Sequence, residues 1–559
     1  MSNHRQKIYL SSGLCLACLF LGAFAAHRWA DAPLTVGVVR QAEQLMGLEF
    51  SDAEADSMLT ELTDNRKSYE AMRKIDVKND VAPALLFDPL PVGFQFEKVQ
   101  NPLKLSPLVA VNVPANRDDL AFLSIRQLSE LLRTKQLSSL ELTRFFLGRL
   151  KKHDPQLHCV VTLTEDLALK QAATADAEIK AGRYRGPLHG IPYGAKDLLA
   201  KKGYKTTWGS VPYRDQTLDY DATVVQRLEK AGAVLCAKLS LGELAWGDVW
   251  FGGTTKNPWD LSQGSSGSSA GSASSVAAGC LPFAIGSETL GSIVSPSSEC
   301  GTTGLRPTFG RVPRTGAMTL SWSMDKLGPI TRNVEDLALV FDAIRGTDGR
   351  DATVRNAPFN YDGTQALKGM KIGFLKKAFD RKYPNHAADS LTLSVLRKLG
   401  AQLVPIELPD YPVGDMTLLL SVEGAAAFDE LTRSNRDDQM VRQIKNAWPN
   451  VFRAARFVPA VEYIQANRLR TKLIQEMHQT LQGIDVYVSP AFGGPNLALT
   501  NLTGHPCVVL PNGFRPEAGK PDRPTSITFM GQLFGEAKLL QVARAYQEAT
   551  DFHKKHPKL

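Results

Sequence analysis

Apolar and polar residues follow one another along the chain in blocks typical of an α/β protein. Short runs rich in valine and isoleucine predict buried strands, and segments in which apolar residues recur at helical spacing predict helices. Strands that alternate with helices in this way indicate a domain built around a central sheet. The expected strands are Val160–Thr164, Val234–Lys238, Met370–Leu375, Gln402–Ile406, Val486–Ser489 and Cys507–Leu510, and the expected helices include Thr223–Ala231, Val334–Ile344 and Leu533–Thr550.

The part of the chain before this domain has a different pattern. Residues 35–76 are expected to be helical, with a capping box at Ser51 and Glu54. One buried stripe is expected there, formed by Met58, Leu59, Leu62, Tyr69 and Met72.

A proline-rich apolar stretch, 81–108, follows and predicts a strap without regular structure. We therefore expect a helical extension and strap over residues 33–118, and the main domain over 119–559.

The first residues have the layout of a signal peptide. A short basic start, MSNHRQK, precedes an almost wholly apolar segment, 8–26, that ends in small residues. Residues 1–26 are therefore predicted to be a signal peptide cleaved near Ala25 or Ala26, and the protein to be exported to the periplasm or the extracellular space. The competing interpretation is an uncleaved membrane anchor, because about 19 apolar residues can span a bilayer.

Composition narrows the class of protein further. The chain has 559 residues, of which 43% are hydrophobic and 22% charged, and these values are ordinary for a globular protein. The net charge of +8 is spread without a dense basic block, so nucleic-acid binding is not expected. Five of the seven cysteines lie beyond the leader, and their spacing suggests buried free thiols, with neither a metal site nor a cofactor.

The segment that points most clearly to catalysis lies between Gln263 and Arg306, where the chain reads QGSSGSSAGSASSVAAGCLPFAIGSETLGSIVSPSSECGTTGLR. Glycine- and serine-rich segments are usually flexible linkers. A linker, however, has no need of the apolar run Val276–Ile285, which indicates buried structure. Because glycine allows close backbone approach, the pattern fits N–H groups directed at a ligand.

This segment resembles the signature of the amidase signature family. The likeness extends to GPLHGIPYGAKD before it and MDKLGPITRNVEDLAL after it, and it covers residues 124–559. It implies an α/β fold with a central mixed sheet covered by helices on both faces. It also implies hydrolysis of a linear carboxamide through a serine acyl-enzyme, with a small-molecule amide as substrate.

The resemblance assigns a Ser-Ser-Lys triad. Lys196 matches the family's base, Ser268 its bridging serine and Ser292 its nucleophile. The family holds the bridging serine after a cis peptide, which here is Gly267–Ser268. The spacing to the nucleophile selects Ser268 rather than its neighbours Ser265, Ser266 and Ser269.

The proposed chemistry places demands on the lysine. A serine hydroxyl is a weak nucleophile that must lose its proton as it attacks, and lysine can accept that proton only when neutral. Burial lowers a lysine pKa, and the apolar residues around Lys196 predict burial. A salt bridge with Asp197 would keep the amine charged, so Asp197 is expected to face elsewhere.

By the same resemblance, backbone N–H groups of Thr289, Leu290, Gly291 and Ser292 form the oxyanion hole. Most members have Gly-Gly-Ser where this chain has Leu290-Gly291-Ser292. A leucine restricts φ and adds bulk beside the nucleophile, which affects the geometry of the hole and the width of the pocket. Trp246, with Trp250 and Phe251, either walls an apolar pocket or packs in the core.

Alternatives remain for the identity of the nucleophile and for the function of the protein. Cys300 is the rival nucleophile, although no histidine is placed beside it to activate it. An alternative function is the glutaminase (A) subunit of a tRNA-dependent amidotransferase. Residues 33–118 weakly resemble the small accessory subunit of such an amidotransferase, but a simple amphipathic helical hairpin explains the same residues. The leader argues against that function, and the complete triad argues against a binding protein without activity.

Overall fold

The computed structural model describes residues 32–75, 77–517 and 519–559, and the chain divides into two compact units. The first unit comprises the chain up to Lys78 together with Phe457–Pro459. The second comprises residues 79–456 and 460–559. The predicted signal peptide, residues 1–26, lies outside the described part of the chain. Each helix of that part is too short or too polar to cross a bilayer.

Two helices form the first unit, α2 (Val36–Met46) and α3 (Asp52–Met72). The predicted capping box of α3 is confirmed, because the Ser51 hydroxyl accepts the N–H of Glu54 and the Glu54 carboxylate accepts the N–H of Ser51. Arg40 of α2 donates to Phe50 and Asp52, so it ties the first helix to the start of the second.

The predicted buried stripe of α3 is wrong in its second half, because only Met58, Leu59 and Leu62 of the stripe are half-buried. Tyr69 and Met72 are exposed, and the buried residue of this helix is Ala55. The physical reason is that Asn65 and Arg66 occupy the face between Leu62 and Tyr69, so the apolar stripe is not continuous.

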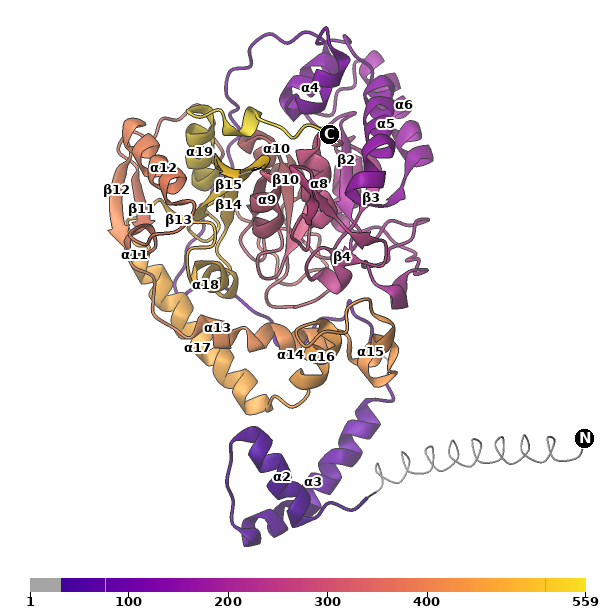
Figure 1. Ribbon diagram of the computed structural model, residues 1–559, viewed down its shortest axis with the longest axis vertical. Coiled ribbons are helices and arrows are strands. Elements are labelled where there is room, and N and C mark those ends of the chain that lie inside the picture. The colour runs from indigo at the N-terminus through magenta and orange to yellow at the C-terminus, as the bar shows by residue number, and fades with distance from the viewer. Residues whose placement is uncertain (1–31, 76, 518) are drawn as a thin grey trace, which may run out of the picture. The chain divides into compact units, whose positions relative to one another are not determined.

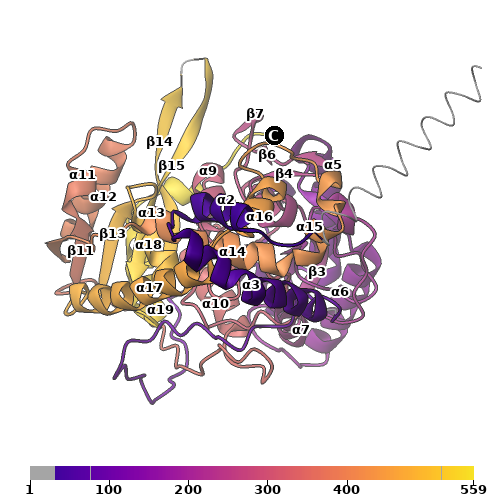
Figure 2. The ribbon, with the colours of Figure 1, turned by 90° about the horizontal axis from the view of Figure 1, so that it is seen from below.

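The second unit contains an eleven-stranded mixed sheet in the order β1-β3-β2-β8-β10-β9-β14-β15-β13-β11-β12 (Figures 1 and 2). Its strands are β1 (Val160–Leu163), β2 (Pro192–Lys196), β3 (Val234–Leu239), β8 (Phe283–Glu288), β9 (Thr303–Arg306), β10 (Lys326–Thr331), β11 (Lys371–Leu375), β12 (Gln402–Ile406), β13 (Val486–Pro490), β14 (Cys507–Glu517) and β15 (Lys520–Gly531). Two small ribbons lie outside it, β4–β5 (Val249–Trp250 with Gly253–Thr254) and β6–β7 (Lys256–Asn257 with Asp260–Gly264).

Parallel strands occur in two groups within this sheet. One group is β3, β2 and β8, and the other is β13, β11 and β12. The strands between β8 and β13 are joined by five successive antiparallel pairings. The carboxyl ends of the two parallel groups therefore lie at opposite edges of the sheet, and each edge can hold a ligand site.

Helices cover both faces of the sheet, as the resemblance implies. Every residue of β2, β3, β8, β9 and β10 is buried, and successive strand residues point to opposite faces. The longer helices are α4 (Ile125–Arg133), α5 (Ser139–Leu157), α6 (Glu165–Lys180), α7 (Thr223–Lys230), α8 (Ala270–Ala277), α9 (Val294–Cys300), α10 (Val334–Ile344), α12 (His386–Lys398), α14 (Leu418–Ala427), α16 (Trp448–Ala455), α17 (Ala460–Thr480), α18 (Asn496–Thr503) and α19 (Glu536–Glu548).

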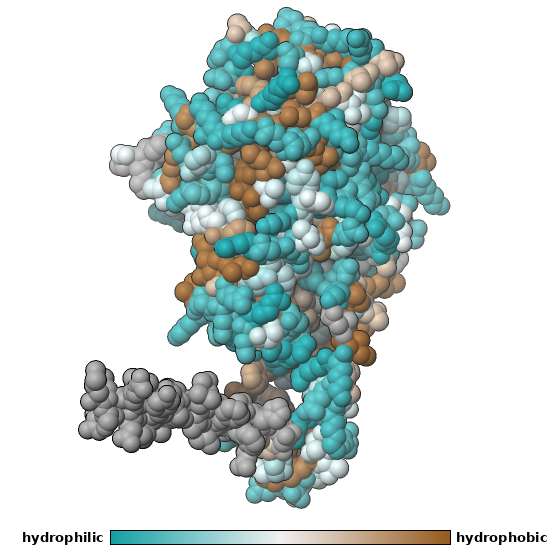
Figure 3. Space-filling model, turned by 90° about the vertical axis from the view of Figure 1, so that its right-hand side faces the viewer, coloured by the Kyte–Doolittle hydropathy of each residue, from teal (hydrophilic) through white to brown (hydrophobic). Residues whose placement is uncertain are grey.

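The strands and helices predicted from the sequence are confirmed within three residues at their ends, except that the strand predicted as Cys507–Leu510 extends to Glu517 as β14. The apolar run Val276–Ile285 is buried as expected, but it is divided between the end of α8 and the start of β8. Figure 3 shows one face of the molecule, where hydrophilic side chains predominate and apolar patches are small.

The proline-rich segment 81–108 has no helix or strand and belongs to the second unit. Lys104 is its one bridge residue: its N–H donates to Tyr361 at 3.0 Å, and its carbonyl accepts from Gly363 at 2.7 Å. Ser106 donates its N–H and its hydroxyl to the Glu335 carboxylate, each at 2.8 Å. The segment is thus a strap fastened to the core.

Candidate active site

Lys196 ends β2, at the carboxyl edge of the first parallel group, and its side chain is fully buried. Its amine lies 2.8 Å from Ser268 Oγ, 2.8 Å from Ser287 Oγ and 3.1 Å from Ser269 Oγ. Among the residues that the structure describes, no carboxylate forms an ion pair with this amine. Three hydroxyl groups therefore replace the counter-charge that a buried lysine usually requires.

Asp197, the next residue, faces away from Lys196, as expected. Its carboxylate forms a fully buried ion pair with Lys238 at 2.6 Å and accepts the Thr207 N–H at 2.9 Å. The carboxylate nearest to Lys196 in sequence therefore pairs with Lys238 and does not form an ion pair with Lys196.

Burial lowers the pKa of Lys196 well below its usual value. Asp325 and Glu288 oppose this, because their negative charges raise the same pKa by smaller amounts. On balance, the site favours the neutral amine far more than water does around an exposed lysine.

The loop between β7 and α8, residues 265–269 and here named the serine loop, packs tightly against the segment that carries Trp246. The peptide Gly267–Ser268 is cis, as the resemblance implied. A Cβ on Gly267 would lie 1.8 Å from the carbonyl oxygen of Gly247, so this position excludes any side chain. Asp248 accepts the Ser266 N–H at 3.0 Å and fixes the same loop.

Ser292 follows β8 by four residues and is 8% exposed. Its carbonyl accepts the N–H of Ser269 at 3.1 Å, which places the predicted nucleophile beside the predicted bridging serine. The hydrogen bonds within the described ranges do not include one between the Ser268 and Ser292 hydroxyls. Such contacts are often long in unliganded enzymes and shorten when substrate binds.

The turn before Ser292 presents unused donors. Within the part of the chain that the structure covers, the backbone N–H groups of Thr289, Leu290, Gly291 and Ser292 donate to no protein acceptor. Gly291 has φ of +91°, which requires glycine, whereas Leu290 has no positive φ. The leucine therefore fits the turn without backbone strain, and it packs half-buried against the core beside the nucleophile.

Glu288 fixes the other end of this turn. Its carboxylate accepts the N–H groups of Ile293 and Val294, each at 2.9 Å, and forms a buried ion pair with Arg306 at 2.8 Å. Burial would raise the pKa of Glu288, but the Arg306 guanidinium and the donated hydrogen bonds hold that pKa at about 2. The carboxylate therefore stays charged and anchors the start of α9.

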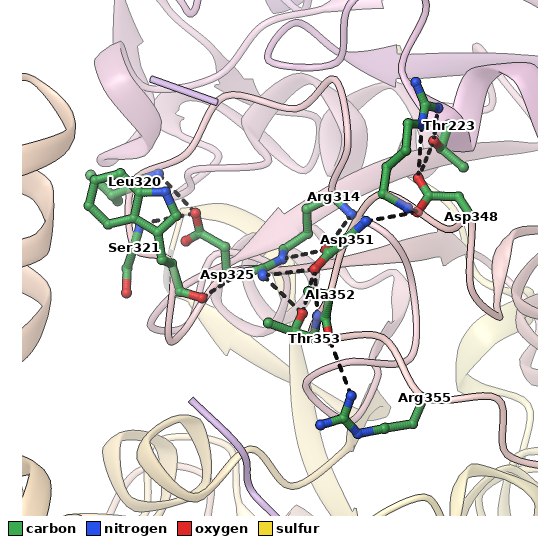
Figure 4. Close-up of polar contacts among 12 residues, drawn as sticks. Thr223, Arg314, Leu320, Ser321, Asp325, Asp348, Asp351, Ala352, Thr353 and Arg355 are labelled. Carbon is green, nitrogen blue, oxygen red and sulfur yellow. Dashed lines mark hydrogen bonds and ion pairs between the residues drawn. The ribbon is translucent and has the colours of Figure 1, made fainter. Parts of the chain in front are cut away.

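Asp325 holds Thr289 from the opposite side. It accepts the Thr289 hydroxyl at 2.6 Å and the N–H groups of Leu320 and Ser321 at 2.8 and 3.0 Å. Figure 4 shows Asp325 with Leu320 and Ser321, beside Arg314, which pairs with Asp351. Hydrogen bonds through Asp325 thus connect the segment of Leu320 and Ser321 to Thr289, three positions before Ser292.

The aromatic residues near the site differ in how far they are buried. Trp250 is buried and packs against Phe251, whose ring lies 4.9 Å away. Trp246 is half-buried; its ring lies 6.3 Å from that of Trp448 and carries the Arg442 guanidinium over it at 5.0 Å. Because Trp246 directly precedes Gly247, it flanks the serine loop.

Burial accounts for the rival nucleophile, Cys300. Cys300 is fully buried, and burial raises the pKa of its thiol well above the usual value, which disfavours the reactive thiolate. All five cysteines in the described residues are free and buried.

Sequence reasoning missed Ser287, Ser269, Glu288 and Asp325 as members of the site. Ser287 and Glu288 lie inside the motif itself, and Asp325 lies in the flanking MDKLGPITR, so the motif contained them. Their roles depend on contacts between separate elements, which the motif does not specify.

Most of this chain is similar in sequence to known proteins. The family model described as Amidase matches residues 141–509. The glutamyl-tRNA(Gln) amidotransferase A subunit of Coxiella burnetii is 33% identical over 485 residues, which are 78% of this chain and 99% of that protein.

Solved structures are similar as well. The native peptide amidase of Stenotrophomonas maltophilia has a TM-score of 0.68 and 32% identity, and covers 76% of this chain and 96% of its own. An amidase family protein of Bacillus anthracis has a TM-score of 0.71 and 28% identity, with 79% and 93% covered. The chain therefore belongs to the amidase signature family and is a hydrolase of carbon–nitrogen bonds in amides.

Proposed function

We propose that this protein cleaves a linear carboxamide through an acyl-enzyme on Ser292, with Ser268 as proton relay and Lys196 as base. One observation carries the proposal: a fully buried amine is surrounded by hydroxyl groups and lacks a carboxylate partner within the described residues. A charged ammonium in such a place is costly, so the neutral form, which can accept a proton, is favoured.

The hydrogen bonds around the amine support its role as base. The Ser269 hydroxyl already donates its one proton to the Ser287 carbonyl at 3.0 Å, so it can only accept from Lys196. A neutral amine has two N–H groups and one lone pair. With the N–H groups directed at Ser269 and Ser287, the lone pair is left for the proton of the Ser268 hydroxyl.

The reaction then proceeds by acyl transfer. As Ser292 attacks the amide carbonyl, its proton passes to Ser268 and the Ser268 proton passes to Lys196. The free N–H groups of the Thr289–Ser292 turn stabilise the oxyanion, and each donor of this kind contributes about 3–4 kcal/mol. Proton return expels the amine, and water releases the acid by the reverse route.

A second candidate, the glutaminase subunit of a tRNA-dependent amidotransferase, uses the same chemistry. The curated relatives favour it more directly, since the protein from C. burnetii named above belongs to such an amidotransferase. The predicted leader supports a free-standing, exported amidase instead, as do the similar peptide amidase structures. Attachment to a membrane through residues 8–26 is compatible with the same proposal.

The first prediction concerns the charge near Lys196. Asp325→Asn removes one of the two carboxylates that raise the Lys196 pKa, so the acid limb of the kcat/KM profile is expected to move to lower pH. Plateau activity falls about tenfold, because a hydrogen bond to a charged group is lost at Thr289. Asp351→Asn is the matched control in the same network. A limb that stays in place in Asp325→Asn, or moves equally in both variants, contradicts this account.

The second prediction concerns the nucleophile. Ser292→Ala is expected to abolish labelling by a fluorophosphonate probe and to lower amide turnover by at least about 10⁴-fold. Ser265→Ala removes a hydroxyl from the same loop and should be labelled like the wild type. Labelling that survives in Ser292→Ala would assign the nucleophile to another residue.

The third prediction separates the two candidate functions. The purified chain alone should release ammonia or amine from simple amides, in a panel that varies acyl length and amine group. Turnover that requires partner proteins and tRNA, with none by the isolated chain, would establish the amidotransferase function instead.

A further inference from the structure

Two adjoining cavities lie apart from the candidate active site, with volumes of about 320 and 210 Å³. None of the triad or oxyanion residues lines either of them. They form one continuous hollow, here named the Arg515 cavity, because both are lined by Asn385, Ala491, Phe492, Arg515 and Ser526.

The Arg515 cavity lies at the carboxyl ends of the second group of parallel strands. Residues 381–385, in the connection from β11 to α12, and residues 490–494, which end β13 and follow it, both contribute to its wall. In open α/β sheets ligands bind outside the carboxyl ends of the strands. The catalytic residues use one such edge of this sheet, and the Arg515 cavity is at the other.

Charge in the cavity is unbalanced. Arg515 on β14 lies directly opposite Arg523 on β15, in the hairpin that projects from the sheet in Figure 2. Like charges directly opposite each other destabilise a strand pair. Arg523 is paired with Glu299, whereas Arg515 has no side-chain partner among the described residues.

The remaining acid of the cavity does not neutralise Arg515. Asp389 is buried and uses both of its oxygens internally, one with Asn512 at 2.6 Å and the other with Tyr383 at 3.0 Å. Arg381 and Lys382 add two further positive charges at the exposed rim.

The other residues that line the cavity can accommodate the apolar part of a small organic molecule. Phe492 is 57% exposed and forms one wall together with Pro384 and Pro490. Two polar atoms of the lining, Asn385 Oδ1 and Ser298 Oγ, are buried without a protein partner in the described residues. The cavity therefore combines an unpaired guanidinium, an apolar wall and unused hydrogen-bonding atoms.

We infer that the Arg515 cavity binds a small organic carboxylate, whose anionic group pairs with Arg515 and whose apolar body packs on Phe492. A guanidinium matches a carboxylate with two parallel hydrogen bonds. Ser298, at the end of α9, lines the same cavity, and α9 begins two residues after Ser292. If the proposed function holds, the acid released by the enzyme belongs to the same chemical class as this ligand.

The experiment uses the full chain with Ser292 blocked by a fluorophosphonate, so that the catalytic pocket cannot contribute. Calorimetric titration with benzoate should give saturable binding at one site. Arg515→Gln should weaken binding at least about tenfold, because the charge-assisted pair is lost. Lys377→Gln, the matched control, removes the same charge from a residue that pairs with Glu407 and does not line the cavity. It should leave binding unchanged.

Two further arms test the parts of the ligand. Phe492→Ala, a change at an exposed side chain that leaves the core intact, should also weaken benzoate binding. Benzamide, the neutral analogue, should not bind. Equal affinity for benzamide, or identical titrations of wild type and Arg515→Gln, would overturn the inference. If the probe fails to label Ser292, the proposed function fails, while the comparison of Arg515→Gln with Lys377→Gln still decides the inference.

Discussion

The proposed chemistry depends on the burial of the Lys196 amine away from water. Lys196 ends a strand that is buried along its whole length, and its amine contacts three serine hydroxyls and, at 3.4 Å, the carbonyl oxygen of Ser287. The adjacent acid, Asp197, is diverted to Lys238, so the charge that would otherwise keep the amine protonated is absent from its contacts. Another buried lysine, Lys326, contacts a backbone carbonyl and lies in register with Glu288, so it does not compete for the serine hydroxyls.

The turn that carries Ser292 is organised by two buried carboxylates. Glu288 holds the start of α9, and Asp325 holds Thr289, so the turn is fixed at both ends. Their charges also raise the pKa of Lys196, which works against a neutral base. Both acids are engaged by other groups and neither contacts the amine, so the turn can be held by charge while burial still controls the protonation of the lysine.

Part of this could be predicted from sequence. The valine-rich strands such as β13 and the helices around them follow from residue periodicity. The strands that carry the site, β2 and β8, were not predicted, because PYGAK and FAIGSE contain glycine, proline and serine and owe their burial to neighbouring strands. The triad was placed by a motif. The roles of Ser287 and Asp325, and the pairing of Arg515 with Arg523 across two strands, depend on tertiary contacts that no local pattern contains.

The proposed role of Lys196 as base depends on its protonation state, which can be observed directly. Nitrogen NMR of the protein labelled at lysine side chains, with Lys196→Met used to assign the signal, reports whether the amine carries a positive charge. As the base, Lys196 should show the chemical shift of a neutral amine at about pH 7.5, well below the usual lysine pKa. An ammonium shift that persists until the pH reaches the range of ordinary exposed lysines would contradict it.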